Sequence, residues 1–129
     1  MDSMRSIEIV ARIGVFGTFL GHGIAALFVN IKWIPLLTCY GISINNAKEL
    51  MPFIGMLDIV VAFIVLFYPL RIVLIWAVFW AFLTAISRPI SGGEWIEFVE
   101  RSSNWCLPLI VLHMQGFPKN IPSLFKIKA

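Results

Sequence analysis

Four long apolar stretches constrain this chain more than any other feature of its sequence. A helix needs about 20 mostly apolar residues to cross the hydrocarbon core of a bilayer. The sequence predicts such spans at about residues 13–36, 52–70, 72–90 and 95–116. The fourth differs from the others because a polar half, 94–104, precedes its apolar half.

The composition supports the same conclusion. Apolar residues make up 60% of the chain and charged residues 13%, against about 45–50% and about 25% in soluble domains. So few charges cannot cover a globule of this size, and the remaining surface must face lipid. We therefore predict an all-α integral membrane four-helix bundle, and exclude a soluble enzyme, a disordered chain and a disulfide-stapled secreted module. The basic residues are scattered, which is not typical of a protein that binds nucleic acid.

The segments outside the spans predict the domain organisation and the sidedness. We expect a cytoplasmic N-terminal segment at 1–12, the bundle at 13–116 and a basic tail at 117–129. No Lys/Arg-rich start or cleavage site is present near the beginning, so we expect no cleaved signal peptide. With four spans, six basic residues fall on the side of the two termini and four on the other side. This bias predicts that both termini are cytoplasmic.

Two ionisable residues lie deep in predicted spans, where a charge costs about 2.5–3.5 kcal/mol. Asp58 has the small residues Gly55 and Ala62 at helical spacing, so we expect it to point into the bundle. It either serves a binding site or makes an inter-helix hydrogen bond that only fixes packing. His22 can carry a proton, donate a hydrogen bond to a quinone, or ligate haem or a chlorophyll-type pigment. A single structural hydrogen bond is the alternative.

Small and aromatic residues in the first three spans predict how these helices pack and which side chains face lipid. Glycines at helical spacing predict close helix packing at Gly14, Gly17, Gly21 and Gly55. The aromatic residues of the third span, which include Trp76 and Trp80, are predicted to face lipid or to pack in the core. An aromatic wall for a cofactor is the alternative interpretation.

The fourth span carries the densest set of polar residues. Five residues share one face of a continuous helix: Glu97, Glu100, Arg101, Asn104 and Pro108. Glu97 and Arg101 have the favourable i,i+4 orientation for an ion pair. Together with polar residues of the other spans, this face predicts an outward-facing polar pocket formed by His22, Asp58, Arg88, Glu100, Arg101 and Asn104. Alternatively, residues 94–101 lie on the membrane surface as a solvated amphipathic segment.

Motifs for hydrolytic or metal chemistry are absent from the sequence. Cys39 and Cys106 lack the spacing of a CxxC redox, zinc or haem-attachment motif. They are either free thiols or, on an oxidising outer side, a disulfide. We therefore assign no catalytic residue and no metal site, and we do not expect the chain to be catalytic on its own.

The first span contains Arg12-Ile13-Gly14 and Phe19-Leu20-Gly21-His22-Gly23, and the second contains Met56-Leu57-Asp58. With the charged entry to the last span at 94–104, these motifs resemble the DoxX-like family of small four-span membrane proteins over residues 10–115. The resemblance implies a four-helix bundle in a prokaryotic inner membrane, and some relatives are membrane subunits of quinone-linked sulfur oxidoreductases. Asp58 stands where that family more often has Glu. By architecture alone, the chain is also similar to the sterol-binding EXPERA family.

These observations lead to three functional hypotheses. The first is an accessory or anchor subunit of a larger redox or energy-converting membrane complex, with other membrane subunits and lipids as partners. The second is a quinone-interacting oxidoreductase component in which His22 and Asp58 relay protons. The third is a binder or carrier of a small amphipathic ligand.

Overall fold

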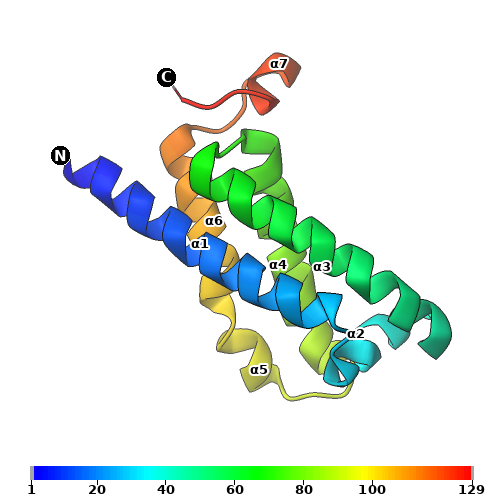
Figure 1. Ribbon diagram of the computed structural model, residues 1–129. Coiled ribbons are helices and arrows are strands. Elements are labelled where there is room, and N and C mark those ends of the chain that lie inside the picture. Colours follow the sequence, from blue (N-terminus) through cyan, green and yellow to red (C-terminus); the bar gives the residue numbers. More distant parts are fainter. Residues whose placement is uncertain (1, 129) are drawn as a thin grey trace.

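The computed structural model describes residues 2–128, and within this range its regular structure is entirely helical (Figure 1). The all-α prediction is therefore confirmed. Three helices are long and apolar enough to cross a membrane: α1 (Ser3–Leu27), α3 (Ile44–Phe67) and α4 (Arg71–Ile90). The shorter elements are η1 (Ile31–Trp33), α2 (Ile34–Thr38), α5 (Trp95–Val99), α6 (Ser102–Gln115) and α7 (Ile121–Leu124).

The helix boundaries differ from the predicted spans because polar caps begin two helices earlier than their apolar stretches do. The side chain of Asp2 accepts a hydrogen bond from the backbone N–H of Met4, so α1 already begins at Ser3. Ser43 caps α3 in the same way, which leaves Pro52 inside that helix and not in its first turn. The predicted segment 1–12 is thus largely helical.

The end of α1 and the fourth predicted span also differ from expectation. Helix α1 stops at Leu27, Val29 adopts a positive φ of 55°, and Asn30 then caps η1. The predicted span at 95–116 is divided into α5 and α6, since the helix is interrupted at Glu100 and Arg101. Helix α6 has 14 residues, fewer than the about 20 that a full crossing needs.

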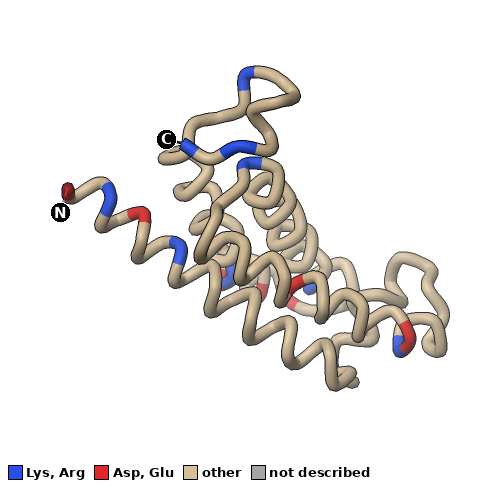
Figure 2. Tube along the Cα trace, turned by 45° about the horizontal axis from the view of Figure 1, so that its top comes forward, with Lys and Arg blue, Asp and Glu red and all other residues tan. Residues whose placement is uncertain are grey.

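The helices are arranged as two pairs that cross each other (Figure 1). Helix α1 packs along α3, and α4 packs along α6, while α1 also contacts α6. The turn between α3 and α4, the chain's N-terminal region and α7 lie toward one end, and α2 and α5 lie toward the other (Figure 1). Figure 2 shows that charged residues are sparse along α3 and α4 between their ends.

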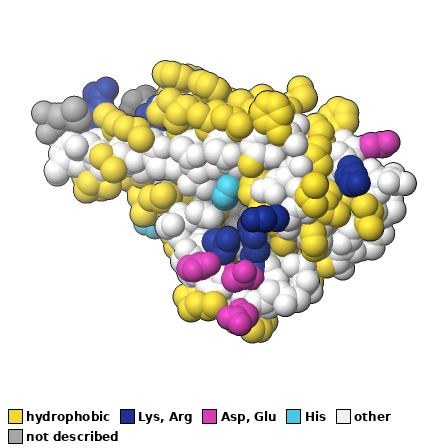
Figure 3. Space-filling view, turned by 60° about the horizontal axis from the view of Figure 1, so that its bottom comes forward, with side chains coloured by type: hydrophobic (Ala, Val, Ile, Leu, Met, Phe, Trp, Pro, Cys, Tyr) yellow, Lys and Arg dark blue, Asp and Glu magenta, His cyan; other side chains and the backbone are white. Residues whose placement is uncertain are grey.

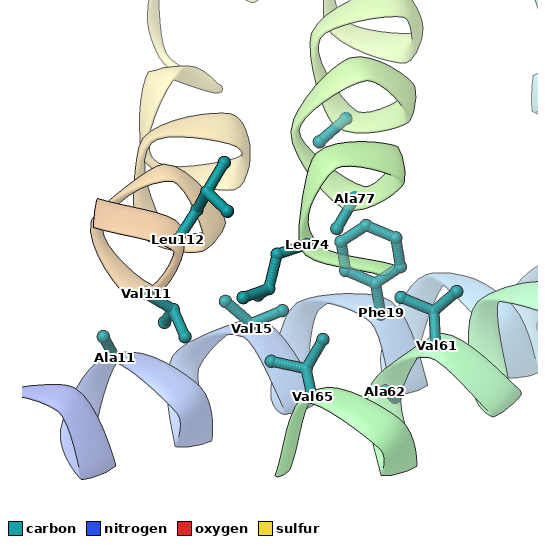
Figure 4. Packing of buried hydrophobic residues seen from close by; sticks show 11 residues of the cluster. Ala11, Val15, Phe19, Val61, Ala62, Val65, Leu74, Ala77, Val111 and Leu112 are labelled. Atoms are coloured by element: carbon teal, nitrogen blue, oxygen red, sulfur yellow. The ribbon is translucent and has the colours of Figure 1, made fainter. Parts of the chain in front are cut away.

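The main core, shown in Figure 4, is where the two pairs meet. Leu74 of α4 is fully buried and lies beside Val15 of α1 and Val65 of α3, with Val111 of α6 also fully buried in this cluster. A second, smaller cluster joins the end of α1 to α2 and the start of α3, and consists of Ala26, Ile34, Ala47 and Met51. The bundle therefore has two separate apolar cores.

The outer surface of the long helices is apolar as well. Large apolar side chains that are more than one-third exposed follow each other at helical spacing along α3: Phe53, Met56, Val60, Phe63 and Phe67. Helix α1 carries a similar stripe at Ile7, Val10, Ile13 and Ile24. Soluble monomers rarely expose continuous apolar surface of this kind. The three long apolar helices support a membrane-spanning protein.

Two glycines form a close contact between α1 and α3. A Cβ atom on Gly55 would lie 2.5 Å from the carbonyl oxygen of Gly23, and one on Gly23 would lie 2.8 Å from the carbonyl oxygen of Gly55. Gly55 is thus a packing residue, but its partner is Gly23, which the predicted glycine set did not include. No described residue outside their own helix lies within 4 Å of a Cβ position at Gly17 or Gly21, so neither glycine packs closely against another described helix of this chain.

Gly14 packs differently, against the side chain of Leu107 in α6. A Cβ atom there would lie 2.9 Å from the Leu107 Cδ1 atom. This contact joins α1 to α6 and not to α3.

Gly55→Ala is expected to lower the free energy of unfolding in detergent by about 1–3 kcal/mol, because the new methyl group forces two backbones apart. Gly17→Ala is the matched control, since its methyl group meets open space and alanine favours the helix by about 0.5–1 kcal/mol. Denaturant titration of both variants measures the difference. Equal stabilities would contradict the close contact of α1 with α3.

Candidate functional site

A cavity of about 460 Å³ lies between the two apolar cores. Phe19 and Ala81 of the main core border it on one side, and Ala26 and Met51 of the smaller core border it on the other. Its wall is formed by α1, α2, α3, α4 and the beginning of α6. The volume falls in the range of about 300–1,000 Å³ that is typical of sites for small molecules.

Aromatic and aliphatic side chains form most of the wall. The indole rings of Trp76 and Trp80 are stacked, with centroids 5.4 Å apart and planes 13° apart, and both border the cavity. Trp33 contributes a third indole from η1. These rings offer flat apolar surface, with which an apolar ligand can pack closely.

Asp58 is the most deeply buried charged residue that borders the cavity. Its side chain is only 5% exposed, and its Oδ1 atom has no hydrogen-bond partner among residues 2–128. The Nε1 atom of Trp76, also part of the wall, is buried without a partner there as well. Buried polar groups are nearly always paired, because leaving one unpaired costs about 1–3 kcal/mol. One acceptor and one donor are therefore left for a molecule in the cavity.

Two arginines border the cavity where it is more exposed. Arg88 lies in the last turn of α4, its Nε atom is buried, and this atom has no partner in the described part of the chain. Arg101 lies between α5 and α6, and its Nη1 atom donates to the carbonyl oxygen of Glu97 (2.9 Å) and to the Glu100 carboxylate (3.1 Å). Figure 3 shows basic and acidic side chains gathered on this face of the molecule.

His22 borders the same cavity from α1 but is exposed. Its imidazole ring meets the Trp33 indole edge to face, with centroids 5.5 Å apart. No described residue forms a hydrogen bond with this imidazole that would fix a tautomer. The geometry thus places a ring capable of donating or accepting a proton beside the two arginines.

Most of the predicted pocket comes together, with one exception. The cavity is lined by His22, Asp58, Arg88, Arg101 and Asn104. Glu100 is not part of the lining and its side chain is 60% exposed, because the helix break turns it away from the face of Asn104. The same break separates the expected ion pair, and Arg101 pairs with Glu100 and not with the Glu97 carboxylate. Residues of α5 lie largely at the surface, as the alternative interpretation expected.

The aromatic wall was only the alternative interpretation of the sequence. Trp76 and Trp80 were mainly predicted to face lipid or pack in the core, whereas both border the cavity. A signal was present, since Trp76, Trp80, Thr84 and Arg88 follow at intervals of four and all line the cavity. An ionisable residue on the same helical stripe as tryptophans indicates an internal polar site more than a lipid face.

Two arginines at the other end of the bundle are, in contrast, satisfied by backbone carbonyls. Arg12 donates to the carbonyl oxygens of Val65 and Leu66 at the end of α3. Arg71 donates to the carbonyl oxygens of Gln115 (2.6 Å) and Gly116 (2.7 Å). These arginines hold helix ends together and are not available to a ligand.

Other candidate chemistry finds no geometric support among the described residues. Cys39 and Cys106 are free thiols. No group of three or more His, Cys, Asp or Glu side chains gathers in a metal-binding arrangement within residues 2–128.

Comparison with known proteins yields no relative. No protein-family model matches the chain, and no curated protein or solved structure matches it.

Asp58→Leu is expected to leave the free energy of unfolding unchanged or to raise it by up to about 3 kcal/mol, because a buried carboxyl group whose Oδ1 atom lacks a partner among residues 2–128 is replaced by an apolar group. Gln115→Leu serves as the contrasting variant. Gln115 is also buried, but it donates to Glu8 and accepts from the backbone N–H of Lys128, so we expect a loss of about 1–3 kcal/mol. If Asp58→Leu destabilised the protein as much, Asp58 would serve packing alone.

Proposed function

We propose that this chain is a four-span membrane protein that binds a small amphipathic molecule inside its helix bundle. The observation that carries the proposal is the cavity of about 460 Å³, whose wall is mostly apolar but includes the unpartnered polar atoms of Asp58, Trp76 and Arg88. Natural ligand sites combine apolar walls with a few polar groups that orient the ligand. Among the three functional hypotheses, the binder or carrier fits this arrangement best, because an accessory subunit does not require a cavity of this kind and a quinone-linked oxidoreductase requires redox chemistry in addition to the cavity.

The fourth crossing in this proposal consists of α5 and α6. Helix α6 packs against both α1 and α4, and at 1.5 Å per residue it extends over about 21 Å. Helix α5 crosses the remaining thickness of the bilayer, at the end of the bundle where the cavity lies. Membership of the DoxX-like family and a prokaryotic inner membrane belong to the same proposal, with both termini in the cytoplasm. The basic residues Arg71, Lys119, Lys126 and Lys128 at that end of the bundle support this sidedness.

A second candidate function is an accessory subunit of a larger membrane complex. The observation that favours it is the open surface over Gly17 and Gly21 on α1, between the exposed side chains of Ile13 and Ile24. Small residues at such a surface allow the close approach of a helix from another protein. Extraction in mild detergent tests this candidate, since a species of 14.6 kDa plus detergent alone would contradict it. The quinone-linked alternative would use the same cavity, bordered by His22 and Asp58.

Thr84→Phe is expected to reduce ligand binding by at least about tenfold, since its ring would fill part of the cavity that Thr84 lines. Thr38→Phe is the control, because Thr38 lies outside the lining, and the hydroxyl group of each threonine donates to the carbonyl oxygen three residues earlier. The measurement is quenching of tryptophan fluorescence by ω-bromododecanol in phosphatidylcholine vesicles. Trp33, Trp76 and Trp80 line the cavity and report its occupancy.

Only the part of the quenching that unbrominated dodecanol displaces counts as binding, because the probe also dissolves in the bilayer. Equal displaceable quenching in the two variants would contradict binding in the cavity.

A further inference from the structure

The arginines beside the cavity indicate which chemical class of ligand it takes. We infer that the ligand is an acidic amphiphile whose carboxylate or phosphate group binds Arg88. The inference rests on the proposed function, since it specifies the molecule that the same cavity holds.

The first argument is the balance of charge around the cavity. Two arginines and one carboxylic acid line it: Arg88, Arg101 and Asp58. The Glu100 carboxylate lies 3.1 Å from the Nη1 atom of Arg101 and offsets that charge, so Arg88 is the lining cation that has no salt-bridge partner among residues 2–128. An uncompensated cation in a low-dielectric wall is costly, and a ligand anion would offset that cost.

The second argument is that Arg88 has no partner of its own. No acidic side chain among residues 2–128 forms an ion pair with it, and its buried Nε atom lacks an acceptor. Of the two nearby acids, Glu100 is bound to Arg101, and the Glu97 carboxylate lies against Gly93. A guanidinium group presents its N–H donors as a planar fork that matches a carboxylate or phosphate group. Arg88 therefore has the free donors that an anionic head group needs.

The third argument is the order of polar and apolar groups along the cavity. Arg88 and Arg101 are partly exposed, as is Asn104 beside them, whereas the Trp76 and Trp80 rings provide an apolar wall. An amphiphile would place its acidic head between the arginines, where water still reaches it, and its chain along the indoles. This arrangement keeps most of the ligand's apolar surface out of water.

The carboxyl group of Asp58 would instead attract a competing class of ligand, an amphiphile with an ammonium group. Asp58 is 5% exposed and lies among apolar side chains, so an ammonium group would have to lose its water entirely to reach it. Desolvation of this kind offsets much of the attraction between two charges. The partly exposed arginines bind an anion at a smaller desolvation cost, which favours the acidic class.

The test compares three probes with the same chain: ω-bromododecanoate, ω-bromododecanol and ω-bromododecylamine, each added to the full chain in phosphatidylcholine vesicles. Saturable quenching of tryptophan fluorescence gives the affinity of each. We expect the acid to bind at least about tenfold more tightly than the alcohol, since a hydrogen bond to a charged group contributes more than a neutral one. Equal binding of acid and alcohol, or tightest binding of the amine, would overturn the inference while leaving a ligand-binding cavity in place. Failure of all three probes to bind saturably would instead overturn the proposed function, and this inference with it.

Variants of single arginines test which positive charge gives the preference for the acid. Arg88→Gln is expected to abolish the preference for the acid, so that acid and alcohol bind with about equal affinity, and Arg88→Lys to retain part of the preference. Arg5→Gln, on the exposed start of α1, is the control and should retain the full preference. Persistence of the full preference in Arg88→Gln would overturn the assignment to Arg88. If that variant does not fold, the comparison of the three probes on the unaltered chain still decides the ligand class.

The acidic group can come from a free fatty acid or from an anionic phospholipid of the surrounding bilayer. Vesicles in which part of the phosphatidylcholine is replaced by phosphatidylglycerol distinguish these sources. Displacement of ω-bromododecanoate by phosphatidylglycerol indicates a lipid head group, and unchanged binding indicates a free acid. Both results agree with an acidic ligand at Arg88.

Discussion

The contact between Gly23 and Gly55 is the constraint on which the rest of the bundle depends. It brings the backbones of α1 and α3 together at a distance that any Cβ atom would prevent. Because α1 and α3 are held together there, the pair formed by α4 and α6 meets them mainly in the core around Leu74 and Val15. The smaller core beneath α2 closes the opposite side. The space between these two cores is the cavity, so the internal site follows from how the helix pairs cross.

Arg12 and Arg71, at one end of the bundle, differ from Arg88, at the other end, in their hydrogen-bond partners. Toward the termini, Arg12 and Arg71 are saturated by carbonyl oxygens at helix ends, where the partial negative charge of the helix dipole is located. Toward α5, Arg88 donates to no such carbonyl and forms no ion pair within the part of the chain that the structure describes. Arg12 and Arg71 therefore stabilise helix ends, whereas the guanidinium group of Arg88 is available to bind a ligand. The hydrogen-bonding state of the arginines therefore identifies the candidate site more clearly than the number of charged residues near it does.

The lengths of the apolar stretches were enough to predict the helical class and the three long helices, because the removal of apolar side chains from water determines both. It could not predict where helices begin, since Asp2 and Ser43 cap them through local hydrogen bonds outside the apolar stretches. Most of the polar lining was predictable, because ionisable residues such as Asp58 are costly in an apolar span unless they face inward. Glu100 was misplaced because its position depends on a helix break that periodicity does not reveal. Tryptophans are equally suited to lipid, core and cavity walls, so the assignment of Trp76 and Trp80 depends on the ionisable Arg88 on the same helical stripe, which the prediction for this span did not use.

The amide of Gln115 joins three distant parts of the chain. It donates to the Glu8 carboxylate in α1 and accepts from the backbone N–H of Lys128 in the tail, while the backbone carbonyl oxygen of Gln115 accepts a hydrogen bond from Arg71. During synthesis, the tail leaves the ribosome after every helix of the bundle. The hydrogen bond between Lys128 and Gln115 can therefore form only after all the helices have been synthesised.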